Sequence, residues 1–230
     1  MLSLILPIHN EEGNLKKNFD LIYKETKKLG NFEIILAEDG STDNSPTICR
    51  EKSKMLHVRL MTSNHRLGKG KAIKEAITLA KGNIIGCLDI DMAVPARYLN
   101  KAVTLVDNGE VFVTGSRYIK GSDANRSILR LFASLSYNWL IALLFQSKVK
   151  DHQCGFKFWS SRFIKTYIKK VKDDHWFFDT ELIIMAQRDG IKVREFPISW
   201  DEQPQSNVHI SDVIYFINAA LRLRLRMKND

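Results

Sequence analysis

The chain has 230 residues and a net charge of +9, with 44% of its residues hydrophobic and 27% charged. This length and composition are typical of a soluble globular protein with one large α/β domain or two small ones. No run of about 18 consecutive apolar residues is present, so we predict no membrane-spanning helix. The positive charge favours an anionic partner, which leaves nucleotide phosphates, nucleic acid and an acidic membrane surface as candidates.

The cysteines and the N-terminal segment indicate the compartment. Cys49, Cys87 and Cys154 are odd in number and lack metal-ligand spacing, so we expect reduced thiols in a cytosolic protein. The chain starts directly with the strand-like segment Leu2–Pro7, without a basic region or a cleavage site, so we expect no signal peptide. The histidines also lack ligand spacing, and we assign no zinc site.

Apolar, β-rich runs alternate with helical patterns along the first half of the chain. This alternation predicts an α/β fold in which helices cover both faces of a mainly parallel sheet. We see no internal repeat and no linker, so we treat 1–230 as one domain with a C-terminal elaboration from about Arg126. The predicted strands are Leu2–Pro7, Phe32–Ala37, Val58–Met61, Asn83–Leu88 and Val111–Gly115, and the predicted helices are Glu11–Leu29, Asn44–Lys54, Lys71–Lys81 and Ala96–Val106.

Polar clusters follow four of these predicted strands. Ligands of such folds bind beyond the carboxyl ends of the strands, so we predict that the four clusters form one site. The clusters are Asn10-Glu11, Glu38-Asp39-Gly40-Ser41, Asn64–Gly70 and Asp89-Ile90-Asp91.

The most informative cluster is the carboxylate pair of Asp89 and Asp91. An apolar run, Ile84–Leu88, leads into it, and alternate residues of a strand point to the same side. Two hard oxygen ligands at a strand end suit a Mg²⁺ or Mn²⁺ ion that stays partly open for a phosphate-bearing substrate. Asp-x-Asp alone also fits a solvated turn, and it is the neighbouring clusters that favour a metal site.

Two of the remaining clusters suit a nucleotide. Carboxylates in Glu38–Asp43 can accept hydrogen bonds from a base or a ribose, although an ordinary Asp-Gly turn gives the same letters. Glycines and lysines in Asn64–Lys71 precede a helix, whose N-terminus favours anions. The spacing is not that of a P-loop, and a solvated basic loop is the alternative.

The second half carries further candidates. Gly115-Ser116-Arg117 ends a predicted strand, and Arg126 and Arg130 follow; arginines can bind phosphate through two nitrogens. Phe178–Leu182 places Asp179 and Glu181 at the start of a helix, where acids often only complement the helix dipole.

Two apolar stripes at helical spacing lie in this half. One is Ile128, Phe132, Leu135, Trp139 and Leu143; the other is Ile210, Ile214, Ile217, Leu221 and Leu225, flanked by Arg222, Arg224, Arg226 and Lys228. The alternating arginines and leucines also fit a strand, but the upstream periodicity favours a helix. Basic amphipathic helices can lie in a membrane interface, whereas packing on the core is the alternative for both stripes.

In their order, these motifs resemble the family 2 glycosyltransferases, which have the GT-A (Rossmann-like) fold. The resemblance covers about Leu2 to Asn207, and its second half is similar to the polyprenyl-phosphate (dolichyl-phosphate) hexose synthases, particularly their glucose branch. The first-half motifs are Leu6–Glu11, Ala37–Asp43, Arg66–Gly70 and Asp89–Asp91, and the second-half motifs are Gly115–Arg117, Asp151–Lys157, Phe178–Leu182 and Ile198–Glu202 with Ser206.

Three positions depart from the pattern of these relatives. His152 stands where the glucose branch usually has Thr, and Asn207 where it often has Lys. Ala93 stands where mannose synthases often place a Gln metal ligand, which weakens a mannose interpretation. The transmembrane helices of many relatives are not predicted here, so membrane contact would come from the amphipathic segments or a partner.

The resemblance implies a role for each matched residue. Asp89 and Asp91 would bind Mg²⁺ or Mn²⁺, and Asp91, Asp179 and Arg117 would be the catalytic residues. Asp179 would be a weak base or an orienting group. The donor nucleotide sugar would contact Pro7, Asn10, Glu11, Glu38, Asp39, Gly68, Lys69 and Asp89, and the acceptor phosphate would contact Arg117, Arg130 and Ser134.

The hypothesis that follows is an inverting, metal-dependent hexosyltransferase at the cytoplasmic face of a membrane, peripherally bound. It would use UDP-glucose as donor and a polyprenyl or dolichyl phosphate as acceptor. The nucleotide-sugar half would span 1–118, the acceptor half 119–207, and an amphipathic helix 208–230. The alternatives are a GDP-mannose-dependent synthase, a family 2 transferase with a polysaccharide or protein acceptor, and a non-catalytic nucleotide-sugar binder. No nucleic-acid reader motif is present, so we expect no nucleic-acid partner.

Overall fold

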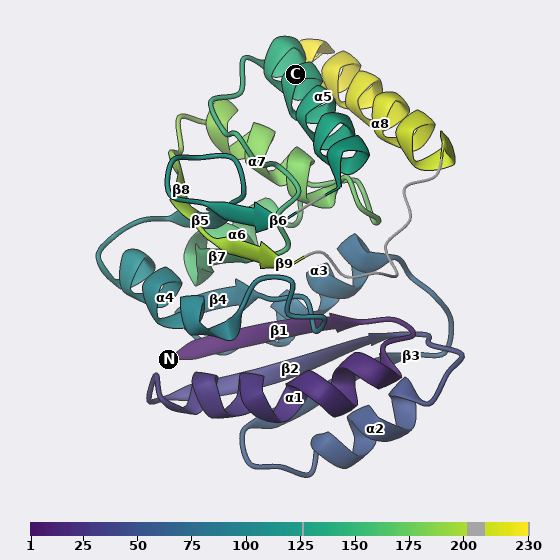
Figure 1. Ribbon diagram of the computed structural model, residues 1–230, viewed down its shortest axis with the longest axis vertical. Helices are drawn as coiled ribbons and strands as arrows, with labels where there is room; N and C mark the ends of the chain where they lie inside the picture. Colours follow the sequence, from purple (N-terminus) through teal and green to yellow (C-terminus); the bar gives the residue numbers. More distant parts are fainter. Residues whose placement is uncertain (126, 202–209, 230) are drawn as a thin grey trace.

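A twisted, mostly parallel sheet forms the centre of the protein (Figure 1). The computed structural model describes residues 1–125, 127–201 and 210–229, and in this part the main sheet has seven strands in the order β3-β2-β1-β4-β7-β5-β8. Only β7 runs antiparallel to its neighbours β4 and β5. The strands are β1 Leu2–Ile8, β2 Phe32–Asp39, β3 Val58–Ser63, β4 Ile84–Cys87, β5 Phe112–Ser116, β7 Lys157–Ser160 and β8 Val193–Pro197.

Helices cover both faces of this sheet because its strands are apolar on both sides. Leu4 and Ile34 point to one face, where Phe19 of α1 packs, and Ile5 points to the other, where Ile73 of α3 packs. The predicted α/β fold is therefore confirmed. The helices are α1 Glu12–Lys27, α2 Ser45–Lys52, α3 Lys69–Leu79, the 3₁₀ turn η1 Ala96–Tyr98, α4 Leu99–Asp107, α5 Ile128–Phe145, α6 Ser161–Tyr167, α7 Phe178–Arg188 and α8 Ile210–Asn229.

The second half of the chain adds two features that the alternating pattern did not predict. A small parallel sheet joins β6 (Asp123–Asn125) to β9 (Ser199–Asp201). The strand β7 inserts between β4 and β5, and its first residue, Lys157, is fully buried. Both features bring segments of the second half next to the end of β4, where the carboxylate pair lies.

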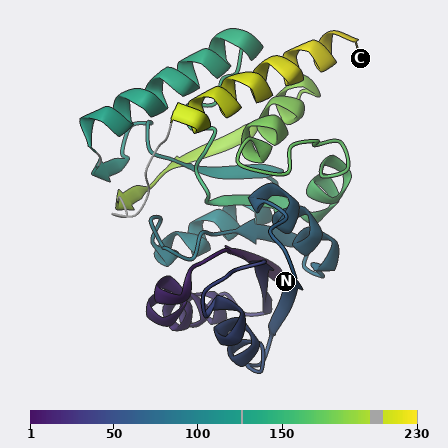
Figure 2. The ribbon, with the colours of Figure 1, turned by 90° about the vertical axis from the view of Figure 1, so that its right-hand side faces the viewer.

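Two long helices, α5 and α8, lie side by side at one end of the molecule (Figures 1 and 2). A separate apolar cluster joins them to α7, with Ile141 of α5, Ile184 of α7 and Leu223 of α8 among its buried members. This confirms the predicted C-terminal amphipathic helix. In the described part of the chain, no helix combines the length and the apolar character needed to cross a membrane.

Candidate active site

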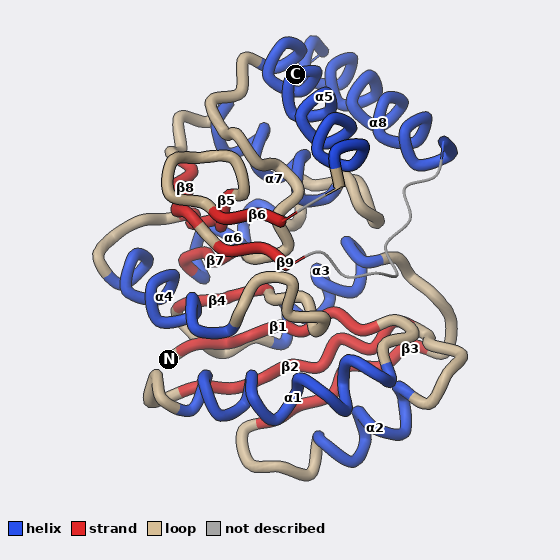
Figure 3. The backbone as a smooth tube through the Cα atoms, in the orientation of Figure 1, coloured by secondary structure: helices blue, strands red, loops and turns tan. Residues whose placement is uncertain are grey.

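The loops after β1, β2 and β3 meet at one edge of the sheet (Figure 3), and side chains connect them. Asn10 has a left-handed backbone (φ 56°), and its Oδ1 accepts a hydrogen bond from the Thr42 amide at 2.8 Å. The Asn10 and Glu11 amides donate to the hydroxyls of Ser41 and Ser45. Burial raises the pKa of Glu11, and the nearby Asp89 carboxylate adds to this, so Glu11 belongs to the same electrostatic environment as the carboxylate pair.

The two buried carboxylates at the end of β2 hold the chain's own loops. Asp39 accepts hydrogen bonds from the amides of Leu67 (2.6 Å) and Gly68 (3.0 Å). Glu38 accepts from the Ser41 amide and the Thr62 hydroxyl, both at 2.6 Å. The carboxylate oxygens of Glu38 and Asp39 thus bind groups of the protein itself. Their predicted contacts with a nucleoside stay a prediction. Pro7 lies nearby on β1, paired with Ala37 of β2.

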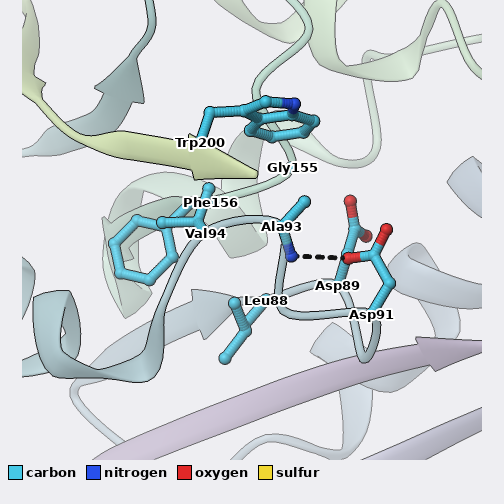
Figure 4. A pocket seen from close by; sticks show the side chains of 8 residues that line it. All are labelled: Leu88, Asp89, Asp91, Ala93, Val94, Gly155, Phe156 and Trp200. Atoms are coloured by element: carbon cyan, nitrogen blue, oxygen red, sulfur yellow. Dashed lines mark hydrogen bonds between the residues drawn. The ribbon is translucent and has the colours of Figure 1, made fainter. Parts of the chain in front are cut away.

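Asp89 and Asp91 lie together beyond β4, on the same side of a small hollow (Figure 4). Lys69, the first residue of α3, places its Nζ 2.7 Å from Asp89 Oδ1. Asp91 accepts a hydrogen bond from the Ala93 amide at 3.0 Å. Burial and the neighbouring Asp89 raise the pKa of Asp91 to about 6. Burial would lower the pKa of Lys69, but the Asp89 and Asp179 carboxylates outweigh it and raise that pKa.

This pair fits a Mg²⁺ or Mn²⁺ ion that takes its remaining ligands from a substrate and water. The donors are hard carboxylate oxygens, and the pKa of Asp91 is raised first by burial and then by the Asp89 charge, a like-charge repulsion that a divalent cation would relieve. In the described part of the chain, no group of three or more His, Cys, Asp or Glu side chains is placed to hold a metal.

Gly155 closes one side of the hollow by close approach of its backbone. A Cβ built at this position collides with the Asp89 carboxylate, so a side chain there is incompatible with the present position of Asp89. Gly68 (φ 104°) is equally constrained, since a Cβ there meets His175 and the Asp174 carbonyl. Gly155 is part of the Asp151–Lys157 motif, but the sequence alone predicts no role for it. Its closeness to Asp89 is visible only in the three-dimensional structure.

Asp179 reaches the site from the start of α7, next to two lysines. Its Oδ1 lies 3.3 Å from Lys157 Nζ, and its charge also contributes to the raised pKa of Lys69. Lys157 is buried and donates to the carbonyl groups of His152 and Cys154. Glu181, in contrast, binds the Lys172 and Asp173 amides and the Arg226 guanidinium. Of the two acids in this turn, Asp179 thus lies at the candidate site, whereas Glu181 connects the loop before α7 to α8.

Arg117 is held by Asp151 through two parallel hydrogen bonds. Its Nε and Nη2 donate to the two carboxylate oxygens at 2.7 and 2.6 Å, and its side chain is only 6% exposed. Burial alone would raise the pKa of Asp151, but the charge and hydrogen bonds of Arg117 outweigh it and lower that pKa. The guanidinium also lies over the Trp200 indole, 4.6 Å from the ring centroid.

The other predicted acceptor residues are on α5. Arg130 and Ser134 are four residues apart and therefore lie on one face of that helix. Their phosphate contacts, like that of Arg117, stay predictions. Arg126, Ser206 and Asn207, which the sequence analysis named, lie outside the described residues.

Solved structures with the same architecture identify the fold. The glucosyl-3-phosphoglycerate synthase of Mycobacterium tuberculosis, crystallised with Mn²⁺, UDP-glucose and phosphoglyceric acid, matches with a TM-score of 0.75. The match covers 97% of this chain and 79% of that one at 18% identity, which shows a shared fold. The fold is GT-A, as predicted.

The sequence profile of glycosyl transferase family 2 matches residues 3–191. The chain therefore belongs to this family and is a glycosyltransferase, which confirms the resemblance noted from its motifs. Glycosyltransferase AglD of Haloferax volcanii is 35% identical over 214 residues, which make up 91% of this chain. The chain spans only 34% of the length of AglD.

Two further relatives have a more specific name. The dolichyl-phosphate beta-glucosyltransferase ALG5C of Trichomonas vaginalis is 30% identical over 227 residues, covering 92% of this chain and 67% of that protein. The dolichyl-phosphate beta-glucosyltransferase of Saccharomyces cerevisiae is 28% identical over 232 residues, covering 91% of this chain and 70% of that protein.

Proposed function

We propose that this protein is an inverting glucosyltransferase that moves glucose from UDP-glucose to a polyprenyl phosphate. The observation that carries the proposal is the grouping of Asp89, Asp91, Lys69 and Asp179 at the carboxyl ends of the strands. The names of the relatives with 28–30% identity over most of this chain support glucose as the sugar and a dolichyl-type lipid phosphate as the acceptor.

The donor half, residues 1–118, would bind the nucleotide sugar. Asp89 and Asp91 would hold a Mg²⁺ or Mn²⁺ ion, which when bound acts as a Lewis acid on the pyrophosphate leaving group. Lys69 starts α3, so its ammonium group and the helix N-terminus would both face the donor phosphates. Asn10, Glu11 and the loops held by Glu38 and Asp39 would border the nucleoside.

The acceptor half, residues 119–207 with Arg117, would place a phosphate oxygen for in-line attack on the anomeric carbon. A phosphate monoester has a second pKa near about 6, so it is largely ionised at neutral pH and needs little help from a base. Asp179 is held by Lys157, and we propose that it orients the acceptor rather than removing a proton. Arg117 would contact the phosphate through Nη1, since Asp151 binds its Nε and Nη2.

We further propose that the protein binds the cytoplasmic face of a membrane through α5 and α8. Both helices leave an apolar stripe exposed, and Phe132 (73%) and Trp139 (68%) on α5 are the clearest examples. The exposed Arg222 and Arg224 of α8 provide charge complementarity to anionic lipids. Such an arrangement would place a lipid acceptor beside the site without a membrane-spanning segment.

A donor panel tests the proposed reaction. The protein would be incubated with detergent-solubilised polyprenyl phosphate, Mn²⁺ or Mg²⁺, and radiolabelled UDP-glucose, UDP-N-acetylglucosamine, UDP-galactose or GDP-mannose. We expect label from UDP-glucose in the organic phase. Label from another donor would change the assigned sugar. No label from any donor, with UDP or GDP still bound, would exclude a lipid-phosphate acceptor.

An Asp91→Ala variant provides the catalytic control. Loss of transfer with an unchanged fold is expected. Asp107→Asn, at the exposed end of α4, is the matched variant that should keep full activity. Near-normal turnover of Asp91→Ala with an unchanged metal requirement would contradict the central role of the carboxylate pair.

A further inference from the structure

Trp200 faces the hollow that contains the carboxylate pair. It is the central residue of β9 and is only half-buried. Figure 4 shows its indole across the hollow from the Asp89 and Asp91 carboxylates. The other residues around the hollow are mostly apolar: Leu88, Ala93, Val94, Gly155 and Phe156. A tryptophan in this position presents a flat apolar surface directly beside the polar groups.

One side-chain contact and two backbone contacts position Trp200. The guanidinium of Arg117 lies over the ring at 4.6 Å, and Arg117 is itself fixed by the buried Asp151. The backbone amide of Asp201, the residue after Trp200, donates to the Ala93 carbonyl at 3.1 Å. This bond joins β9 to the loop that follows Asp91. In addition, Trp200 pairs with Ala124 of β6. These contacts fix the backbone of β9 relative to the loop after Asp91, and the Arg117 guanidinium covers one face of the ring.

We infer that Trp200 forms one wall of the subsite for the transferred hexose and helps to determine sugar binding. The inference rests on the proposed function, since it needs the pyrophosphate of a nucleotide sugar at Asp89 and Asp91. The hexose is bonded directly to that pyrophosphate, so it must lie close to the same carboxylates, next to the residues that line the hollow. A pyranose ring has C–H bonds on its faces, and these pack well against a flat aromatic ring, while its hydroxyls need polar partners at the edge.

The arrangement of Arg117 strengthens this role. A cation over one face of an indole is attracted by the ring and fixes its tilt. The Asp151–Arg117 pair is buried, so water screens it little and the ring is held by a rigid support. Trp200 is then a specificity-determining residue for the donor, and Arg117 is a positioning residue for Trp200 in addition to its proposed contact with the acceptor.

The comparison of UDP-glucose with UDP tests the inference, because only UDP-glucose carries the hexose. Calorimetric titrations with Mn²⁺ would use the full-length protein, Trp200→Ala and the conservative Trp200→Phe. For Trp200→Ala we expect UDP-glucose to bind at least tenfold more weakly, while UDP binds within twofold of the wild type. Trp200→Phe should recover most of the lost affinity for UDP-glucose. Unchanged UDP binding also shows that the variant is folded.

Several results would overturn the inference. A parallel loss for UDP and UDP-glucose would make Trp200 a packing residue of the loop, and no loss for either would remove it from the site. If the wild type prefers GDP-mannose, the assigned donor is wrong, but the same comparison of GDP-mannose with GDP still tests Trp200. If the wild type binds no nucleotide sugar, both the proposed function and the role of Trp200 are excluded.

Discussion

Lys69 Nζ lies 2.7 Å from Asp89 Oδ1, so the lysine at the start of α3 neutralises one of the two carboxylates assigned to the metal. A divalent cation at this pair would be repelled by the ammonium group until donor phosphates draw the lysine away. This contact links donor binding to metal binding through one carboxylate.

We therefore expect Lys69→Met to have opposite effects on metal and donor. Without the competing cation, the nucleotide-free protein should bind Mn²⁺ about tenfold more tightly, which a Mn²⁺ titration followed by electron paramagnetic resonance would measure. Affinity for UDP-glucose should fall. Lys71→Met is the matched control, because Lys71 contacts the exposed Glu75 at 3.9 Å. Unchanged or weaker Mn²⁺ binding in Lys69→Met would contradict this model of competition.

Gly155→Ala should reduce activity without unfolding the protein. The added Cβ meets the Asp89 carboxylate, the mobile end of a side chain, which can move away at a cost of about 1 kcal/mol. Displacement of the Asp89 carboxylate should lower turnover by about 100-fold, because the group proposed to bind the metal is then misplaced. Gly13→Ala is the control, since nothing lies within 4 Å of its Cβ position. Full activity of Gly155→Ala would show that Asp89 does not need its present position.

The first half of the fold was predictable because parallel strand–helix units leave clear periodicities in the sequence. The strands β1 to β4 and the helices α1 to α4 follow from apolar runs and helical spacing. The strand β7 does not, because it begins with Lys157. This lysine is tolerated in a buried position because Asp179 of α7 and two carbonyl groups of the preceding turn surround it, and Asp179 comes from a distant segment of the chain.

The same distinction applies to the site. Asp89 and Lys69 follow strands in the regular part of the sheet, so the rule that strand ends converge brings them together correctly. Trp200 and Gly155 reach the hollow through β9 and through the turn after Asp151, whose positions depend on tertiary contacts. Arg117 was predicted as a phosphate ligand, but its bond to Asp151 was not, because a pair 34 residues apart has no local signal.

Protonation of His152 should destabilise the protein as the pH falls. His152 is fully buried, its Nδ1 donates to Asn138 Oδ1 at 2.7 Å, and its Nε2 lies 2.8 Å from the Ser147 hydroxyl. Burial lowers its pKa to about 4; Asp151 opposes this shift and Lys157 adds to it. The unfolded chain takes up the proton near about pH 6.5, so between about pH 6.5 and 4 it binds more protons than the folded protein. Stability must therefore rise with pH through this window.

Urea unfolding at pH 7.5 and pH 5 measures this effect. The wild type should lose roughly 2 kcal/mol between the two conditions through His152. Arg117 lowers the pKa of Asp151, so that carboxyl loses its contribution only at lower pH. In His152→Thr the difference between the two conditions should shrink by this amount, whatever its absolute stability. His57→Asn, at an exposed position, should keep the wild-type difference. An equal pH effect in His152→Thr would exclude the histidine as its source.

Substitution of the exposed apolar residues of α5 should separate membrane binding from donor binding. Phe132 and Trp139 are 73% and 68% exposed, so Phe132→Ser with Trp139→Ser removes little from the core. Each aromatic side chain that enters a bilayer interface contributes about 1.5–3 kcal/mol, so the double variant should bind anionic vesicles at least 100-fold more weakly. Affinity for UDP should not change. Leu56→Ser is the matched control, since Leu56 is also 73% exposed. It precedes β3, the edge strand of the sheet, which lies far from α5 in Figure 1. Sedimentation with vesicles of mixed neutral and anionic lipid measures this binding. If the wild type does not sediment with these vesicles, or if the Leu56→Ser control loses as much binding as the double variant, α5 is not the membrane-binding surface.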